Sequence, residues 1–284
     1  MGKFDDILLT VDYDRTLTDC NSVIPQRNLE AIRYFMENGG AFTVNTGRSV
    51  PMAQAFRELV PVNAPLLLYN GSAAYDMEKK ELLFCHPIDL DLWETVNWCL
   101  TNLPDMSVEV QGLDAHYRFV EDPMWDGFCA YNHCASACAQ PGDDLSPFLK
   151  FAVFGKLRDV KVADLFQADE KELARMEEVG RILEAQFGHK CEIFRSGPRI
   201  FDVHTKGVSK ARSARELQKT LGKKILVCVG DAHNDISMLD GADYAFVPSD
   251  AVLADQYENV CPCGEGAVAD VIYRKIPEIL KKEA

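Results

Sequence analysis

The sequence predicts an α/β protein with a Rossmann-like, doubly wound parallel sheet and an inserted α/β domain. Three observations lead to this prediction. Short apolar runs bounded by polar residues, typical of buried strands, alternate with stretches of helical spacing near both ends of the chain. Such alternation favours a parallel sheet that helices cover on both faces. Between about residues 84 and 196 the pattern changes, and all three tryptophans lie there.

The first part of the parallel sheet is predicted before residue 85. In chain order, we expect a strand at 7–11, a helix around 29–36, a strand at 41–44, a helix capped by Ser49, a strand at 66–69 and a hairpin at 73–85. Pro51 suits the first turn of the helix that follows Ser49, because that position needs no backbone donor.

The alternation resumes near residue 200. We expect a strand at 200–203, a helix at 209–221, strands at 225–229 and 244–247, and a helix around 267–273. Residues 1–84 and 196–284 are therefore predicted to form one discontinuous core domain.

Residues 85–195 are predicted to form the inserted domain. Two long helical stretches accompany three strand-like pieces, at 91–102, 169–187, 106–110, 116–119 and 151–154. The size and aromatic content of this segment can support a hydrophobic core of its own.

Composition excludes several classes of partner. The formal net charge of −14 repels nucleic acid and acidic membrane surfaces. No apolar stretch reaches the roughly 18 residues of a membrane span, and the first residues lack the apolar region of a signal peptide. Ten scattered cysteines without such a signal favour a reducing compartment, so we expect a cytoplasmic protein. The sequence carries no signal for an oligomeric state.

One group of cysteines has the composition of a metal site. Cys129, His133, Cys134 and Cys138 lie close together in the chain. On a single helix, however, the 129/133 pair and the 134/138 pair point apart, which argues against zinc. We therefore expect small buried cysteines on a helix.

Two carboxylates follow the first strand directly. Asp12 and Asp14 come after the apolar run 7–11, and side chains two residues apart on a strand face the same way. Open α/β sheets bind ligands at the carboxyl ends of their strands. The pair can hold a divalent cation there, although aspartates also open turns for purely structural reasons.

Three further signals lie at predicted strand ends or helix starts. Thr46, Gly47 and Arg48 follow the second strand and offer a hydroxyl and approachable backbone donors for an anion. Lys210 lies in the first turn of a helix, where the helix dipole disfavours a cation unless an anion is near. The acidic and amide residues after the strand at 225–229 are costly together unless they are paired or bind a cation; they are Asp231, Asn234 and Asp235.

In this order, the four signals resemble the motifs of the haloacid dehalogenase superfamily. Residues 12–16 resemble the first motif, 46–48 the second, Lys210 the third and 230–235 the fourth. The place of the insertion, together with Asn70, Gly71 and residues 206–210, resembles the Cof-type branch, whose members are sugar-phosphate phosphatases with an α/β cap. The resemblance covers residues 1 to about 85 and 195 to 284, and the inserted domain only in position and size.

The resemblance implies a Mg²⁺-dependent phosphatase of small phosphorylated metabolites. Asp12 would be the nucleophile that forms an aspartyl-phosphate, and Asp14 the general acid and base. Thr46 and Lys210 would hold phosphoryl oxygens, with Gly47, Arg48, Asn234 and Asp235 beside them. Asp12, the backbone carbonyl of Asp14, and Asp231 would hold the metal. Arg15 and Asn70 are candidates for substrate contact.

Arg15 departs from the family pattern, which usually has glycine at this position. Either the turn needs no positive φ, or some strain is accepted. We expect the Arg15 guanidinium to face solvent or the inserted domain, with contact to a second anionic group of the substrate as the alternative. The residues of the inserted domain that could set specificity are not distinguished by the sequence.

Two other functions use the same residues. A phosphomutase would return the phosphoryl group from the aspartate to the sugar, and a sugar-phosphate-binding protein would lack turnover. The presence of all the motif residues argues against the second alternative. A receiver domain also combines strand-end acids with a lysine, but the inserted domain has no role in it.

Overall fold

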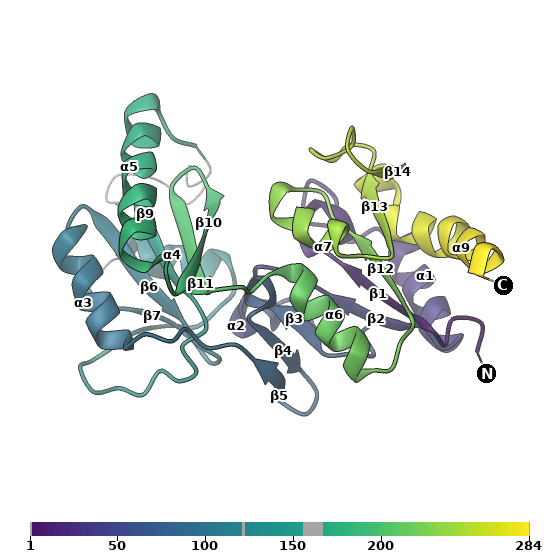
Figure 1. The fold of residues 1–284 in the computed structure, drawn as a ribbon, viewed down its shortest axis with the longest axis horizontal. Coiled ribbons are helices and arrows are strands. Elements are labelled where there is room, and N and C mark those ends of the chain that lie inside the picture. Colours follow the sequence, from purple (N-terminus) through teal and green to yellow (C-terminus); the bar gives the residue numbers. More distant parts are fainter. Residues whose placement is uncertain (1, 121–122, 156–166, 284) are drawn as a thin grey trace. The chain divides into compact units, whose positions relative to one another are not determined.

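The computed structural model describes residues 2–120, 123–155 and 167–283. The chain forms two compact units (Figure 1). The first comprises Met1–Gly47, Arg57–Phe84 and Ser209–Ala284, and the second Arg48–Phe56 and Cys85–Val208. The second unit thus takes in the whole predicted insertion, and the division into core and cap at 84/85 and 195/196 stays a prediction.

The first unit contains the predicted parallel sheet. Its strands follow the order β14-β13-β12-β1-β2, and every neighbouring pair is parallel. The strands are β1 (Ile7–Val11), β2 (Ala41–Val44), β12 (Ile225–Val229), β13 (Tyr244–Pro248) and β14 (Glu258–Val260). A single parallel bridge between Asn45 and Leu67 joins a second sheet of three strands to the end of β2. That sheet consists of β3 (Leu66–Leu68), β4 (Ala73–Asp76) and β5 (Glu81–Cys85).

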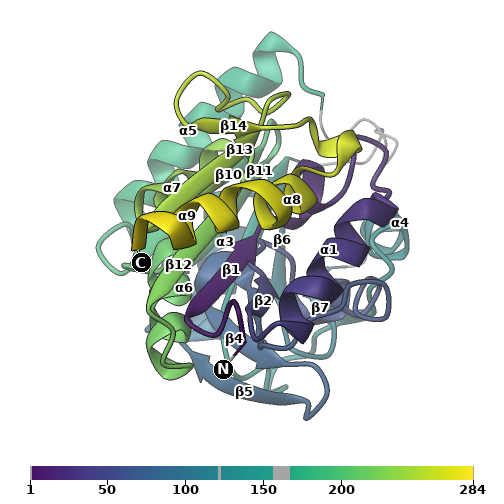
Figure 2. The ribbon, with the colours of Figure 1, turned by 90° about the vertical axis from the view of Figure 1, so that its right-hand side faces the viewer.

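Helices cover both faces of the parallel sheet. Figures 1 and 2 show α6 (Lys210–Thr220) and α7 (Ile236–Asp240) on one face and α1 (Gln26–Glu37) and α9 (Ile276–Glu283) on the other. The last helical stretch of the chain begins with α8 (Ala267–Asp270), which packs against α1. The predicted doubly wound α/β core is confirmed.

The alternation of β1 directs Asp12 toward the face of α6 and α7. Leu8 belongs to the apolar cluster that includes Leu217 of α6 and Met238 of α7. The hydroxyl of Thr10 lies 3.5 Å from the Met238 sulfur. Asp12 follows Thr10 by two residues, so its side chain lies on the same face of the sheet and its carboxylate points toward the start of α6.

The second unit is built on a six-stranded sheet in the order β10-β11-β9-β6-β7-β8. Its strands are β6 (Met106–Gln111), β7 (His116–Arg118), β8 (Ser136–Cys138), β9 (Phe151–Gly155), β10 (Cys191–Gly197) and β11 (Ile200–Thr205). The helices are α2 (Val50–Ala53), α3 (Leu92–Asn102), α4 (Pro123–Tyr131) and α5 (Glu170–Phe187). Apolar side chains from α3, α5 and the sheet form one core cluster, for example Val96, Val108, Phe151, Val179 and Val203.

Residues 200–203 form a strand as predicted, within β11, but the strand does not belong to the parallel sheet, so its predicted place in that sheet was wrong. The strand runs antiparallel between β9 and β10 of the second unit. Its first five residues are buried without interruption. A continuous buried run is the pattern expected of a core strand in a parallel sheet, and the sequence alone does not say which sheet such a strand joins.

The single helix expected around residues 129–138 was also wrong. Helix α4 ends at Tyr131, His133 takes a left-handed backbone conformation (φ 53°), and Cys138 lies in strand β8. The chain therefore turns back on itself, and the Cys134 N–H donates to the Cys129 carbonyl at 2.9 Å. Strands β8, β10 and β14 were not predicted. Within the described part of the chain, no helix combines the length and the apolar character needed to cross a membrane.

Candidate active site

One buried lysine joins two carboxylates at the carboxyl edge of the parallel sheet. The Lys210 Nζ lies 2.6 Å from Asp12 Oδ1 and 2.6 Å from Asp235 Oδ1. The Lys210 side chain is 1% exposed, and both carboxylates are buried as well. Although burial lowers the pKa of Lys210, the charges of Asp12 and Asp235 outweigh burial and raise it. Lys210 therefore carries its charge, with both partners held against it.

The start of α6 is fixed by loops from two neighbouring strands. The Asn45 side-chain amide, just after β2, donates to the Lys210 carbonyl at 2.9 Å. Gly71 approaches Ser209 so closely that a Cβ on Gly71 would lie 2.4 Å from the Ser209 carbonyl oxygen. Its φ of 97° also favours glycine. These contacts hold Lys210 in a first helical turn, where the two carboxylates compensate the unfavourable helix dipole.

Asp235 organises the loop after β12. Its Oδ2 accepts the backbone N–H groups of Asp231 at 2.9 Å and Ala232 at 3.1 Å, while its Oδ1 faces Lys210. Gly230 leaves room for this carboxylate, because a Cβ there would lie 2.6 Å from Asp235 Cβ. Asp235 thus positions both the lysine and the loop that carries Asp231.

Asp231 completes a cluster of three acids. Carboxylate oxygens of Asp12, Asp231 and Asp235 lie within 4.8 Å of one another, and Thr16 Oγ1 donates to Asp231 Oδ1 at 3.1 Å. Three carboxylates share one ammonium group, which leaves a formal charge of −2 when all are ionised. An all-oxygen donor set with excess negative charge fits a hard divalent cation such as Mg²⁺.

Burial shapes the titration of these acids. It raises the pKa of Asp12 well above its ordinary value, against the opposing charge of Lys210. Burial, followed by the neighbouring charge of Asp235, raises the pKa of Asp231 to about 6. In the absence of a cation, the ionised cluster is therefore an unfavourable arrangement.

The turn after β1 carries Asp14 and Arg15. Asp14 is half-buried, and its charge contributes to the raised pKa of Asp12, so the two carboxyl groups are neighbours. Arg15 is exposed and has φ 58° and ψ 11°. The turn therefore does take the left-handed conformation that glycine would allow freely, and the chain accepts this strain at an arginine.

Of the remaining predicted site residues, three lie together next to the end of β2, and the other two are Arg48 and Asn234. Thr46 and Asn70 are buried and linked, since the Asn70 N–H donates to the Thr46 carbonyl at 3.1 Å. Gly47 lies against the Asn70 side chain. Arg48 belongs to the second unit, and Asn234 is exposed.

Two residues of this site, Thr16 and Asn45, were not predicted from the sequence. Each lies in or beside a motif that was identified, and their proximity to Asp14 and Thr46 was the available signal.

Comparison with known proteins identifies the family. The profile of the haloacid dehalogenase-like hydrolases matches residues 9–252. The chain belongs to this family. The predicted superfamily and its enzymatic character are thereby confirmed.

Relatives of this hydrolase include curated phosphatases. It is 23% identical over 241 residues to the 5-amino-6-(5-phospho-D-ribitylamino)uracil phosphatase of Bacillus subtilis, covering 83% of this chain and 80% of the relative. It is 24% identical over 250 residues to the pyridoxal phosphate phosphatase of Escherichia coli, covering 83% and 85%. These relatives support the predicted Cof-type phosphatase.

Solved structures share the fold along nearly the whole chain. A haloacid dehalogenase-like hydrolase from Bacteroides thetaiotaomicron aligns with a TM-score of 0.78 at 21% identity, covering 96% of this chain and all (100%) of the other. A similar hydrolase from B. subtilis aligns with a TM-score of 0.72 at 17% identity, covering 94% and 99%.

The conformation of Arg15 leads to a stability prediction. Arg15→Gly and Arg15→Ala both remove the side chain, but only glycine adopts a positive φ without strain. We expect the glycine variant to be more stable than the alanine variant by about 1 kcal/mol, measured by urea unfolding. Equal stabilities, or a more stable alanine variant, would show that the backbone at this position is not strained.

The raised pKa of Asp231 leads to a prediction on pH dependence. A carboxyl group whose pKa is higher in the folded than in the unfolded protein stabilises the fold only while it is protonated. The folded protein therefore loses stability as the pH rises from the ordinary pKa of an aspartate, near 4, to the folded-state pKa of Asp231, about 6. In EDTA, Asp231→Asn should therefore gain stability relative to the unmodified protein between pH 4 and pH 7, by roughly 3 kcal/mol at most. Urea unfolding followed by circular dichroism measures the difference.

The exposed Asp255 provides the matched control for this experiment. Asp255→Asn makes the same replacement outside the acidic cluster, so the difference between the two variants at each pH isolates the effect of position 231. A stability difference for Asp231→Asn that does not change between pH 4 and pH 7 would contradict the prediction.

Proposed function

We propose that this hydrolase is a Mg²⁺-dependent phosphatase of small phosphorylated metabolites, sugar phosphates among them, and that it works through an aspartyl-phosphate on Asp12. The observation that carries the proposal is the contact of Lys210 with Asp12 within a buried acidic cluster. The names of the two curated relatives support the substrate class, because each describes a phosphatase of a small phosphorylated metabolite.

Asp12 is the proposed nucleophile. Its carboxylate oxygen would form a bond to phosphorus while the bond from phosphorus to the ester oxygen of the substrate breaks. The contact with Lys210 at 2.6 Å directs the carboxylate and favours its ionised form, which opposes but does not cancel the rise in pKa caused by burial. Lys210 and Thr46 would also contact the remaining phosphoryl oxygens, with Gly47, Arg48 and Asn234 as further candidates.

Asp14 is the proposed general acid and base. It would give its proton to the departing alkoxide, and would then take a proton from the water that attacks phosphorus and releases Asp12. Its half-buried position next to Asp12 supports this role. The exposed Arg15 and the buried Asn70 remain candidates for contact with the rest of the substrate.

Asp12, Asp231 and the Asp14 carbonyl are the proposed ligands of Mg²⁺. When bound, the ion would neutralise charge on the phosphoryl oxygens. Asp235 is engaged with Lys210 and two backbone donors, which supports a positioning role for it.

We further propose that residues 85–195 act as a cap that selects the substrate. The ten cysteines scattered along the chain support a cytoplasmic location.

A panel of phosphorylated metabolites tests the function. We expect inorganic phosphate to be released from hexose phosphates or pyridoxal phosphate with Mg²⁺ present, and none in EDTA. Conversion of a hexose phosphate to its isomer without release of phosphate would instead indicate a phosphomutase. Saturable binding of the same compounds without any product would indicate a binding protein, and either result would contradict the proposal.

A matched pair of variants tests the roles of the two aspartates. Asp12→Asn should abolish turnover of every substrate and prevent the formation of an acid-stable, base-labile phosphoryl adduct. Asp14→Asn should slow sugar phosphates by 10²-fold or more, the order of magnitude of general acid catalysis. It should slow aryl phosphates much less, because aryl leaving groups need little protonation. An active Asp12→Asn protein, or equal losses for both substrate types in Asp14→Asn, would refute the corresponding role.

A further inference from the structure

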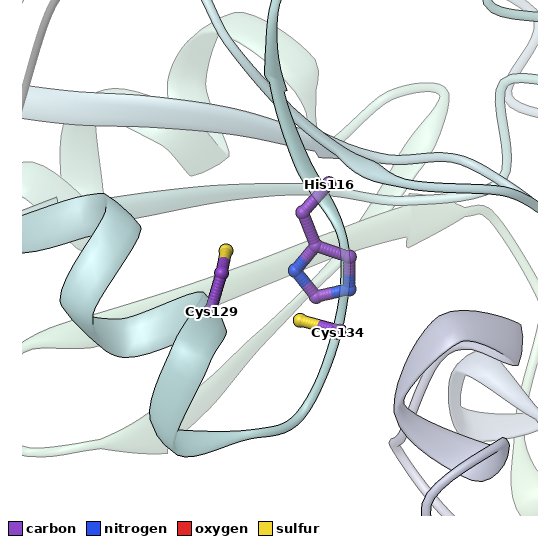
Figure 3. A group of neighbouring side chains, drawn as sticks. All are labelled: His116, Cys129 and Cys134. Atoms are coloured by element: carbon purple, nitrogen blue, oxygen red, sulfur yellow. The ribbon is translucent and has the colours of Figure 1, made fainter.

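A second group of potential metal ligands lies in the second unit, away in sequence from every motif used above. Figure 3 shows His116 of β7, Cys129 of α4 and Cys134 with their side chains directed toward one another. The possible ligand atoms, one from each residue, all lie within 4.8 Å of one another. The group differs from the one considered in the sequence analysis, because His133 is exposed and Cys138 lies in β8.

The fold brings these residues together through ordinary backbone contacts. The left-handed turn at His133 allows the Cys134 N–H to donate to the Cys129 carbonyl at 2.9 Å. The next residue, Ala135, accepts the His116 N–H at 2.9 Å, where β8 begins to pair with β7. Both cysteines are thereby fixed beside the imidazole by hydrogen bonds of the main chain.

Glu109 of the neighbouring strand β6 faces the imidazole of His116. Its Oε2 lies 3.1 Å from His116 Nδ1, and the two side chains are 1% and 0% exposed. Among the described residues, neither atom has a well-directed hydrogen bond to another group. The other carboxylate oxygen accepts from Gln111 Nε2 at 2.6 Å, which orients the carboxylate. Two buried atoms that face each other in this way need a cation or a proton between them.

Ser49 fixes the opposite side of the imidazole ring. Its Oγ lies 2.7 Å from His116 Nε2 and also accepts the Met52 N–H as the N-cap of α2. A contact of this kind on one ring nitrogen orients the ring and leaves the other nitrogen, Nδ1, for the cluster.

We propose that His116, Cys129, Cys134 and Glu109 form a tetrahedral binding site for a thiophilic divalent cation, with Zn²⁺ as the best chemical match. Zn²⁺ is bound in proteins by this kind of donor set, two thiolates with an imidazole and a carboxylate. Tetrahedral coordination places two thiolate sulfurs about 3.8 Å apart and a sulfur and a nitrogen about 3.6 Å apart. The ligand atoms of His116, Cys129 and Cys134 already lie within 4.8 Å of one another and need only small side-chain adjustments to reach these distances. Glu109, which contacts the imidazole, would move toward the cation as the fourth ligand.

The surroundings are consistent with such a site. Trp125 and Phe154 pack with Cys129 in an apolar cluster, and Cys134 lies against the same cluster. This gives the site a water-excluding shell on one side.

Cobalt(II) titration of the reduced full-length protein tests the site. We expect one equivalent of Co²⁺ to produce a thiolate-to-cobalt charge-transfer band in the near ultraviolet, and equimolar Zn²⁺ to remove it. The band requires sulfur ligands, so the acidic cluster around Asp231 cannot produce it. As purified, the protein should contain about one zinc per chain by mass spectrometry. The result is independent of the proposed function, because the two sites share no residue.

Variants assign the ligands. Cys129→Ser combined with Cys134→Ser should abolish the band, and the single substitution of the half-buried Cys134 should do the same with less risk to folding. His116→Gln and Glu109→Gln should each weaken Co²⁺ binding by at least tenfold. The matched control, Cys138→Ser, should keep the band and its stoichiometry, because Cys138 lies outside the group.

Three outcomes would overturn the proposal. The first is the absence of a charge-transfer band at stoichiometric Co²⁺. The second is a band that persists in a folded Cys134→Ser protein. The third is a Cys129–Cys134 disulfide in protein purified without reductant, together with no metal uptake after reduction.

Discussion

The arrangement at the carboxyl edge of the parallel sheet depends on the contacts of the Lys210 ammonium group with two carboxylates. Lys210 joins residues 198 and 25 positions away in the chain, Asp12 and Asp235, across the ends of two strands. A buried charge costs several kcal/mol unless it is paired, and removal of one partner from such a group leaves an uncompensated charge. The lysine therefore stabilises the edge only as long as both carboxylates are held at hydrogen-bonding distance.

The loops at this edge can be understood as supports for that contact. Asn45 and Gly71 come from different strand ends, and both act on the first turn of α6, where Lys210 begins the helix. Gly230 leaves the space that the Asp235 side chain occupies. The arrangement still leaves more negative than positive charge, because among the described residues Lys210 pairs with Asp12 and Asp235 but not with Asp231. The carboxylates are thus held in place by hydrogen bonds while the cluster keeps a net negative charge, which suits it to bind a cation together with a phosphoryl group.

The sequence predicted the parallel core and the residues of this edge because both follow from local pattern. Apolar runs located the strands, and parallel strands end at the same edge, so Asp12 and Asp231 were expected to meet. The conformation of Arg15 could not be predicted, since a positive φ at arginine depends on what the surrounding turn imposes. The position of β11 and the return of the chain after α4 were missed for a related reason. A buried run does not specify its neighbours in a sheet, and the turn at His133 has no glycine to indicate it.

The two groups of acids and thiols also differ in a way that separates their chemistry. The edge of the parallel sheet offers only oxygen, beside a lysine that repels weakly held cations, whereas the group around His116 offers two sulfurs and a nitrogen. Zinc binds more tightly than magnesium to nearly any donor set, so a hydrolase that uses magnesium gains from weak, oxygen-only ligands at the reacting centre. Thiolates and imidazole have the opposite preference and retain zinc at concentrations at which carboxylates do not. The proposed Mg²⁺ and Zn²⁺ sites would therefore be distinguished by ligand type alone.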